Sequence, residues 1–344
     1  MGNVPCSAIN PNLNSLTQIR SVIKFALPHP TLWRTFAQTF ETNVMKILLI
    51  GCGFIGRHFL NAATSAGHQL TVLDHRTHNN HSQLCEEIMG DVRDKNLMAT
   101  VIPEFECVVN LAGVLGTSET ICNPLPSVET NLLGALNVFE AVRSTSGQRR
   151  RTRCVQITVG NYFMNNSYAI TKSSAERFAL MYNREHNTQI AIVRALNAYG
   201  PHQKHIPVRK IIPNFIVEAL NGHPITIYGT GEQVMDMIYV EDVANILLRV
   251  VIAKELDYGR AIEAGTARRT TVNQIAQIVL AITGSTAGVK YMPMRSGEPL
   301  NSEVVADPSS LHKLGVDVGG LVQLEVGLRA TVSWYRENYP WQTQ

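Results

Sequence analysis

Short apolar runs alternate with longer amphipathic segments from residue 45 onward. The runs that we expect to form buried strands are KILLI (46–50), QLTVLD (69–74), CVVNLAG (107–113) and CVQIT (154–158). RHFLNAATSAG (57–67) follows the first of them and has the period of a helix. Strands that alternate with helices of about ten or more residues are typical of βαβ units. The pattern therefore predicts an α/β fold whose first half is a doubly wound parallel sheet.

The second half of the chain has a different pattern. From residue 197 it is rich in Pro, Gly and His, and it continues with a helical segment near 211–221 and short mixed elements. We expect a smaller C-terminal cap. The predicted organisation is a sheet domain over 45–196 and a cap that makes up most of 197–344, with some segments returning to the sheet domain.

Residues 1–44 differ from both parts. They are rich in Pro, Ser, Thr and Asn, and they contain the bases Arg20, Lys24 and Arg34 but only one acid, Glu41. Organelle-targeting peptides have this base-bearing, acid-poor character. A disordered or loosely docked extension, or an upstream start before Met45, is the explanation that we favour. We predict an N-terminal extension that is disordered or targeting.

Composition limits the classes of protein to consider. The 344 residues are 45% apolar and 17% charged, which is typical of a globular chain with a sizeable core. A net charge of +3, spread along the chain, argues against nucleic acid as a partner. Apolar runs are too short to span a membrane, so no membrane partner is expected. The six cysteines lack zinc-site spacing, which predicts reduced thiols and a cytoplasmic protein.

A glycine-rich loop joins the first predicted strand to the first predicted helix. In Gly51-Cys52-Gly53-Phe54-Ile55-Gly56, the first glycine permits a tight turn, the second lets a pyrophosphate approach, and the third allows close packing. The start of the helix offers N–H groups to phosphates. Asp74 ends the next strand, where its carboxylate can bind an adenosine ribose and favour NAD over NADP. This arrangement predicts a Rossmann-type NAD-binding domain over 45–196.

A tyrosine and a lysine stand one helical turn apart later in the chain. Tyr168 and Lys172 share a helix face, and they follow a strand that ends in Thr158. An ammonium group near the phenol lowers the tyrosine pKa, which makes Tyr168 a candidate general base. Lys172 can also hold a nicotinamide ribose, and Thr158 can orient a substrate hydroxyl and stabilise an oxyanion or ketone. The ordinary alternative is an exposed Tyr/Lys pair without a catalytic role.

Together these features resemble the extended short-chain dehydrogenase/reductase family, in its NAD-dependent nucleotide-sugar epimerase and dehydratase branch. The similarity runs from Met45 to about Leu314. Its further segments are GDVRD (90–94), NLAG (110–113), ETNLLG (129–134), RALNAYGP (194–201), IYGTG (227–231) and DMIYVED (236–242).

The resemblance implies a site, a cofactor and partners. We expect NAD, a nucleotide-sugar substrate such as a UDP-sugar, and a homodimer formed through the helices near 127–143 and 168–186. The catalytic residues expected are Thr158, Tyr168 and Lys172. The cofactor-binding residues expected are Gly51, Gly53, Phe54, Ile55, Gly56, Asp74, Asp91, Val92, Leu111, Ala112, Gly113, Tyr168 and Lys172. The substrate-binding residues expected are Thr117, Asn197 and Arg295.

Three departures from the family pattern bear on the reaction. Tyr168 follows Thr158 by only ten residues, whereas family members usually carry a longer substrate-side segment here. Thr158 is followed by Val159 and Gly160 instead of the acids that sugar 4,6-dehydratases use, so elimination is disfavoured. Met235 stands where an arginine usually contacts the diphosphate, which leaves that role to Arg295.

Two other clusters carry possible chemistry. His75, His78 and His81 have spacing that suggests a metal, but no acidic or cysteine ligand accompanies them, so we expect no metal. A basic cluster over 202–210 could face a diphosphate or a sugar carboxylate, or could be a solvated loop.

The leading hypothesis is an NAD-dependent nucleotide-sugar epimerase, an isomerase that acts on a UDP-hexose or UDP-hexuronate at C4 through a transient 4-keto intermediate. One alternative is a dehydratase or reductase of the same family. An alternative of another class is an NAD-binding regulatory or scaffold protein with degenerate catalysis.

Overall fold

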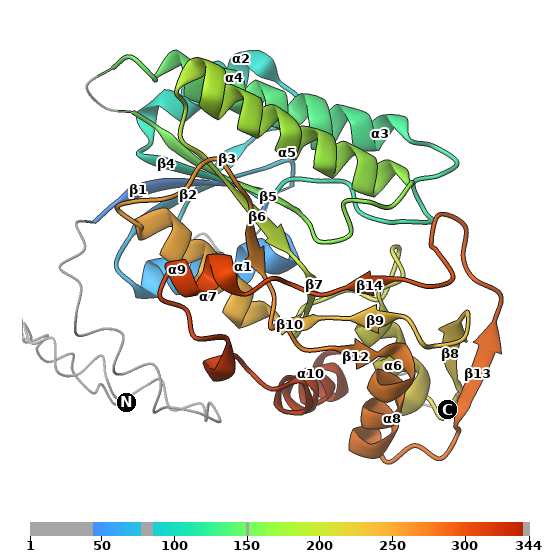
Figure 1. Ribbon diagram of the computed structural model, residues 1–344. Helices are drawn as coiled ribbons and strands as arrows, with labels where there is room; N and C mark the ends of the chain where they lie inside the picture. The colour runs from blue at the N-terminus through green and yellow to red at the C-terminus, as the bar shows by residue number, and fades with distance from the viewer. Residues whose placement is uncertain (1–43, 77–84, 149–150, 340–344) are drawn as a thin grey trace, which may run out of the picture. The chain divides into compact units, whose positions relative to one another are not determined.

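The central element of the fold is a seven-stranded sheet in the order β11-β6-β5-β4-β1-β2-β3 (Figure 1). The computed structural model describes residues 44–76, 85–148 and 151–339, so the extension predicted over 1–44 lies, except for Val44, outside them. All neighbouring strands of the sheet pair in parallel. They are β1 (Lys46–Ile50), β2 (Gln69–Asp74), β3 (Glu86–Met89), β4 (Cys107–Asn110), β5 (Arg153–Val159), β6 (Ile190–Ala195) and β11 (Ile262–Ala264).

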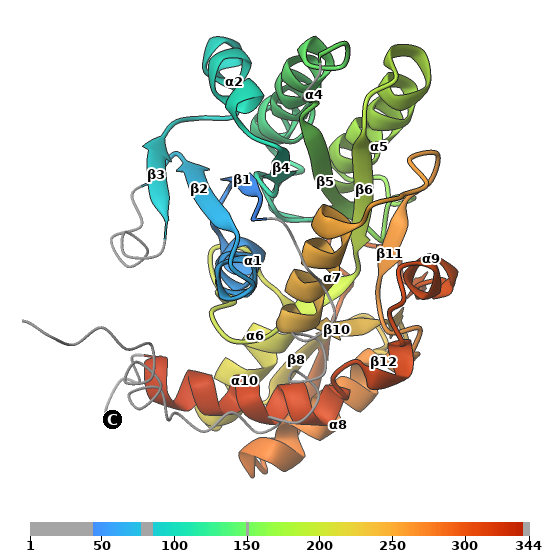
Figure 2. The same cartoon turned by 90° about the vertical axis from the view of Figure 1, so that its left-hand side faces the viewer.

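Helices cover both faces of this sheet (Figure 2). One face is covered by α1 (Phe54–Ser65) and α7 (Val240–Ile252). The other is covered by α2 (Lys95–Val101), α4 (Gly134–Ser144) and α5 (Ser167–His186). The short segments η2 (Ile102–Glu104), α3 (Leu125–Ser127) and η3 (Val128–Leu133) connect them. The predicted α/β fold with a doubly wound, Rossmann-type parallel sheet is confirmed.

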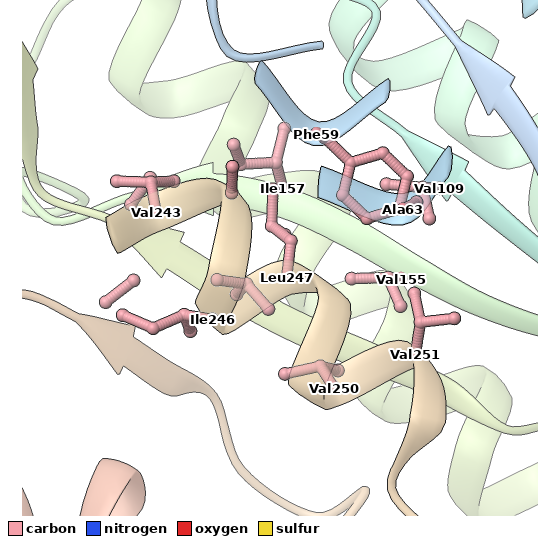
Figure 3. Close-up of a cluster of buried hydrophobic side chains, with 14 of the residues drawn as sticks. Phe59, Ala63, Val109, Val155, Ile157, Val243, Ile246, Leu247, Val250 and Val251 are labelled. Carbon is pink, nitrogen blue, oxygen red and sulfur yellow. The ribbon is translucent and has the colours of Figure 1, made fainter. Parts of the chain in front are cut away.

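The apolar strands have this pattern because both faces of the sheet are buried. In β1, Ile47 and Leu49 pack on the α1 side, and Leu48 and Ile50 pack on the opposite side. Figure 3 shows the first of these cores, where side chains of α1 and α7 meet those of β4 and β5. Fully burying one Leu, Ile or Phe side chain stabilises the fold by about 1.5–3 kcal/mol.

Short sheets and helices from the second half of the chain form the cap. Their shared core includes Tyr199, Phe215, Ile275 and Leu328. Two segments of this half instead belong to the large sheet, since β11 extends it and α7 covers it. The remaining elements are β7 (Asn197–Tyr199), α6 (Ile211–Leu220), β8 (Ile225–Tyr228), β9 (Val234–Met235), β10 (Met237–Tyr239), β12 (Thr270–Thr271), α8 (Val272–Thr283), β13 (Val289–Met292), β14 (Glu303–Val304), α9 (Ser309–Lys313), η4 (Val318–Gly320) and α10 (Leu324–Asn338).

The strand order changes direction between β1 and β4. From β1 the chain adds strands toward β3, and from β4 it adds strands toward β6. The loops after β1 and β4 therefore diverge at the carboxyl edge of the sheet. Crevices at such switch points are where open α/β sheets bind ligands.

No helix among the described residues combines the length and apolar character that a membrane span requires. They also contain no group of three or more His, Cys, Asp or Glu side chains arranged to hold a metal ion. His75 lies beside Asp74, at 3.1 Å between Nδ1 and Oδ1. His78 and His81 fall outside the described residues.

Candidate active site

A cavity of about 690 Å³ opens at the carboxyl edge of the sheet and extends to the cap. Segments far apart in the sequence meet in its wall. Every site residue expected from the sequence lines it: Gly51, Gly53, Phe54, Ile55, Gly56, Asp74, Asp91, Val92, Leu111, Ala112, Gly113, Thr117, Thr158, Tyr168, Lys172, Asn197 and Arg295. The structure therefore brings them together in one place, and their individual roles stay predictions.

The three glycines of the loop meet different surroundings. Gly51 has φ +89°, and a Cβ there would lie 2.8 Å from the amide nitrogen of Ala112. A Cβ on Gly56 would collide with the carbonyl oxygen of Gly51. At Gly53, by contrast, a Cβ would meet no atom within 4 Å. The loop is thus tightly packed at two positions and open at the one where a pyrophosphate would approach.

The start of α1 and the end of β2 complete this part of the cavity. Gly53, the N-cap of α1, provides no side-chain cap, so the first N–H groups of the helix are available to phosphate oxygens. Asp74 accepts a hydrogen bond from the backbone N–H of Cys52 at 2.8 Å and another from that of Arg76 at 3.2 Å. Asp74 therefore fixes the glycine loop, and its contact with a ribose stays a prediction.

Asp91 lies further along the same wall. Arg93 binds its carboxylate through both the guanidinium and the backbone N–H, and the side-chain hydrogen bonds lower the pKa of Asp91. Arg93 also pairs with Glu129 at 3.1 Å. Val92 between them is buried. The carboxylate is consequently held in one orientation at the end of the cavity where the resemblance places adenine.

Asn131 organises the strand end that faces Lys172. Its amide oxygen accepts a hydrogen bond from Val114 N at 2.8 Å, and its amide nitrogen donates to Val114 O at 3.0 Å. The helical segment here is a π-turn, η3, which carries the buried Asn131 toward Gly113. Such turns are frequent at functional sites. The motif ETNLLG contained this residue, but we did not place it in the expected site.

Lys172 is buried, whereas Tyr168 is half-buried. Lys172 Nζ donates to Ala112 O at 3.2 Å, and burial lowers the pKa of the lysine to about 8. Burial also raises the pKa of Tyr168 to about 12. Burial is the cause of both shifts, and the lowering of the tyrosine pKa that we expect from Lys172 stays a prediction.

The hydroxyl of Thr158 has a partner that sequence reasoning missed. Thr158 Oγ1 donates to Glu176 Oε2 at 3.0 Å, and Glu176 is buried against Arg194. Glu176 follows Tyr168 by two helical turns and so shares its helix face with Lys172. This spacing was a usable signal. The hydrogen bond between Glu176 and Thr158 could not be predicted from this spacing, because it depends on how α5 packs on β5.

The cap side of the cavity contains an arginine held by carboxylates. Arg295 forms an ion pair with Glu298 and approaches Glu119 at 3.7 Å between Nη1 and Oε1. Thr117 Oγ1 donates to Glu298 Oε1 at 2.5 Å. Thr117 and Arg295, both expected to bind substrate, thus meet through a glutamate that we did not predict. Asn197 donates from its side chain to Asp236 O at 3.1 Å.

The basic cluster over 202–210 divides in the structure. Arg209 and Lys210 line the cavity, and Lys210 Nζ lies 5.7 Å from the centre of the Tyr168 ring. His202 instead contacts Arg57 at 2.8 Å, and His205 contacts Tyr339 at 3.0 Å. Two of these residues therefore face the site, whereas the two histidines pack between elements.

The positions of the sequence departures are apolar. Met235 lines the cavity where the family pattern has a phosphate-binding arginine. A Cβ on Gly160 would lie 2.9 Å from Cγ of Leu196 and 3.2 Å from Cγ1 of Val304. Because this wall closes on Gly160, a longer acidic side chain at that position would require the apolar residues to move.

The sequence of this chain is similar to a known family and to several known proteins. Residues 47–265 match the family model described as NAD dependent epimerase/dehydratase family. The UDP-N-acetyl-alpha-D-glucosaminuronate decarboxylase of Bacillus cytotoxicus is 27% identical over 315 residues, which cover 83% of this chain and 96% of that protein. The dTDP-glucose 4,6-dehydratase of Mycobacterium tuberculosis is 26% identical over 326 residues, covering 86% and 95%.

A solved structure shows the same arrangement. UDP-glucose 4-epimerase of Thermotoga maritima, determined with UDP-glucose, superposes with a TM-score of 0.77 at 26% identity, covering 85% of this chain and 99% of that one. The similar proteins are named for decarboxylation, dehydration and epimerisation of nucleotide sugars, so the likeness defines the enzyme class but not the reaction. The chain belongs to the NAD-dependent epimerase/dehydratase family, and its cofactor is NAD.

Proposed function

We propose that this protein is an NAD-dependent nucleotide-sugar 4-epimerase that acts on a UDP-hexose or UDP-hexuronate. The observation that carries the proposal is one cavity in which Thr158, Tyr168 and Lys172 meet the glycine loop, beside a wall without an acid at Val159 and Gly160. Such a site has a base for an alcohol but lacks the acid expected for elimination.

Each residue has a distinct task in this reaction. The glycine loop, Asp74 and Lys172 would hold NAD, which would supply hydride transfer to and from the carbinol carbon of the sugar. Tyr168 takes the hydroxyl proton and gives it back, so the protein and cofactor are restored in each cycle. The positive charge of Lys172 favours the phenolate form of Tyr168, and Thr158 positions the reacting hydroxyl.

The distribution of acids in the cavity argues against dehydration. Among the described residues that line it, the acids are Asp74, Asp91 and Glu298. Asp74 holds the glycine loop, Asp91 is bound by Arg93, and Glu298 is paired with Arg295. None of them is a free acid beside Tyr168. Elimination of water needs a general acid for the leaving hydroxyl, and these three are committed elsewhere.

The cap offers positive charge for a diphosphate. Arg209 and Arg295 approach the ring of Tyr228, at 5.8 Å and 5.4 Å from guanidinium carbon to ring centre. Lys210 lines the same cavity, with its Nζ 5.7 Å from the centre of the Tyr168 ring. Guanidinium groups bind phosphate oxygens strongly. We therefore propose that Arg295, with Arg209, takes the role of the arginine replaced by Met235.

The experiment is product analysis with purified protein. We expect the purified protein to contain bound NAD and to interconvert two UDP-sugars without added reductant. The products formed from a panel of UDP, dTDP and GDP sugars are analysed by NMR. Tyr168→Phe is expected to lower kcat by about a thousandfold, since general base catalysis contributes roughly 10²–10⁴. Tyr291→Phe, outside the cavity, serves as the matched control.

Other outcomes separate the remaining hypotheses. Net loss of water or net consumption of cofactor would identify a dehydratase or a reductase. Tight NAD binding without turnover of any nucleotide sugar would favour a regulatory or scaffold protein. An active Tyr168→Phe variant would reject the proposed mechanism.

We also propose that the protein is a homodimer. Ile170 and Phe178 lie two turns apart on α5 and are 50% and 39% exposed, and Leu133 before α4 is 49% exposed. Exposed apolar side chains grouped on neighbouring helices are typical of an interface. Since α4 and α5 are the helices that the family resemblance assigns to dimerisation, a second copy is the proposed occupant.

The cysteines support a reducing compartment as the proposed location. Cys52, Cys107 and Cys154 are free and buried, and the exposed Cys122 is free as well. Burial raises the pKa of Cys52 and of Cys107 to about 12, so these thiols are inert. We propose a cytoplasmic protein on this ground.

A further inference from the structure

A chain of buried charges lies directly beneath Thr158. Arg194 binds both carboxylate oxygens of Glu176 through Nε and Nη2, and its Nη1 contacts Glu263 Oε1 at 2.8 Å. The ring of Tyr162 covers the guanidinium, with its centre 4.1 Å from Cζ. Glu176 is 8% exposed. Arg194 therefore fixes the Glu176 carboxylate in one orientation, shielded from solvent.

This orientation decides what Thr158 can offer to a ligand. A threonine hydroxyl has one hydrogen to donate and two lone pairs that accept. The hydrogen goes to Glu176 Oε2, because a carboxylate oxygen can only accept. Thr158 also lines the cavity with Tyr168 and Lys172. What remains for the cavity is the pair of accepting positions on Oγ1.

We infer that Glu176 is a positioning residue that makes Thr158 a hydrogen-bond acceptor toward the substrate, so that the site holds the alcohol and releases the ketone. The inference rests on the proposed epimerase function and deepens it. The substrate alcohol donates its hydrogen to Thr158 while it is being positioned. On oxidation the hydroxyl turns this hydrogen from Thr158 to Tyr168, which takes it as a proton, and the resulting ketone has none to give.

Release of the ketone matters because an epimerase must let its intermediate turn. The 4-keto sugar has to present its other face before the hydride returns. If Thr158 donated to the carbonyl oxygen, that hydrogen bond would hold the sugar in its first orientation. Because Thr158 donates its hydrogen to Glu176, it faces the carbonyl oxygen with a lone pair. It therefore forms no hydrogen bond that would hold the ketone in place.

Glu176→Gln tests this by inverting the polarity of Thr158. Arg194 donates to Oε1 of Glu176 from both Nε and Nη2 but to Oε2 from Nε alone, so the amide oxygen of glutamine is expected at the Oε1 position. The amide NH₂ then faces Thr158 and donates to it, which turns the threonine hydrogen into the cavity. One new hydrogen bond to the ketone is expected to lower kcat about tenfold. The fraction of bound cofactor in the reduced form during turnover should rise, because the intermediate persists.

Glu263→Gln is the matched control. Glu263 binds the same arginine from the other end, at Nη1, and Thr158 is bound by Glu176 instead. We expect wild-type kcat and a wild-type fraction of reduced cofactor in this variant. Equal effects in Glu263→Gln and Glu176→Gln would show that the charge chain has only a structural role.

Thr158→Val supplies the second arm. Removal of the hydroxyl should lower kcat without accumulation of reduced cofactor, since nothing then donates to the ketone. Adding Glu176→Gln to Thr158→Val should cause no further loss, because residues that act through one group are not additive. Additive losses would overturn the inference.

Folding and the proposed function are tested separately. Melting temperatures of all variants show whether they fold. If Glu176→Gln does not fold, Glu176→Asp replaces it, because the shorter side chain keeps a carboxylate for Arg194 but withdraws it from Thr158. We expect the same accumulation of reduced cofactor in this variant. Wild-type levels of reduced cofactor in an active Glu176 variant would overturn the inference alone. Wild-type protein without turnover would overturn the proposed function and the inference together.

Discussion

Lys172 brings a positive charge into a site that excludes water. The side chain is 3% exposed, and burial lowers its pKa from 10.5 to about 8. The folded protein is therefore less stable at neutral pH than it would be with an uncharged side chain of similar size. The proposed reaction accounts for a lysine here, because it requires an ammonium group beside Tyr168.

We expect Lys172→Met to abolish epimerisation and to stabilise the ligand-free protein. The pKa shift corresponds to about 3 kcal/mol at neutral pH, and loss of the hydrogen bond to Ala112 O removes about 1 kcal/mol of this. The net gain is about 2 kcal/mol in the free energy of unfolding, measured by urea denaturation at pH 7. Lys290→Met, on an exposed strand, is the control and should change stability little.

The gain should depend on pH in a defined direction. Below pH 8 the lysine is protonated in both states, so the cost of burying its charge is fully present. Between about pH 8 and 10.5 the folded protein has released the proton and the unfolded chain still holds it, so wild-type stability rises with pH. The gain from Lys172→Met should therefore fall with pH, reach zero at about pH 10 and reverse above it, because the lost hydrogen bond to Ala112 O still counts against the variant. A difference that is constant over this range would contradict the assignment.

Individual residues of the site could be predicted where local spacing defines them. The glycine loop is one continuous motif, Tyr168 and Lys172 stand one helical turn apart, and Asp74 ends the next strand; all line the cavity. Glu119 could not be predicted in the same way. It reaches Arg295 because the loops after β4 and β13 meet, and that meeting leaves no periodic signal in the sequence.

At the scale of elements, regular strands and helices were predictable and the π-turn was not. KILLI and QLTVLD correspond to β1 and β2 as observed. The segment η3 contains one residue more per turn than an α-helix, and no amino-acid pattern distinguishes it from the helix that follows. The turn is maintained by Asn131, whose amide binds both backbone groups of Val114.

We expect Asn131→Ala to damage both stability and cofactor binding. The change leaves the N–H and carbonyl of Val114 without their partner, at a cost of about 2–3 kcal/mol. The strand end at Gly113 should loosen as a result, so the fraction of protein purified with NAD should fall. Urea denaturation and cofactor release on heat denaturation measure the two effects.

The N-cap residue of α8, Thr271, provides the control for Asn131→Ala. Thr271 accepts a hydrogen bond from Gln274 N in the capping box of α8, and it is not part of the cavity wall. Thr271→Ala should cost about 1 kcal/mol of stability and leave bound NAD unchanged. Equal loss of NAD in the two variants would mean that reduced stability, and not the strand end, governs cofactor binding.

At the scale of the molecule, the alternation of strands and helices predicted the class of fold. It did not predict which segments of the second half belong to the cap and which return to the large sheet. The helix α7 and the strand β11 return to the large sheet, after about 40 residues of cap in the case of α7. Such returns depend on which apolar faces remain uncovered when the sheet forms. Ile246, Leu247 and Val250 cover one of these faces, yet their spacing fits any amphipathic helix.

Assembly is the property of the whole molecule that can be tested most directly. Phe178 is 39% exposed on α5, beside other exposed apolar residues of the proposed dimer interface. We expect Phe178→Asp to weaken dimerisation about a hundredfold, because burying an unpaired carboxylate there costs about 3 kcal/mol. Val326 has the same exposed fraction but lies on α10, so Val326→Asp should leave the dimer intact. Sedimentation over a range of concentrations measures both, and equal dissociation constants for the two variants would place the interface elsewhere.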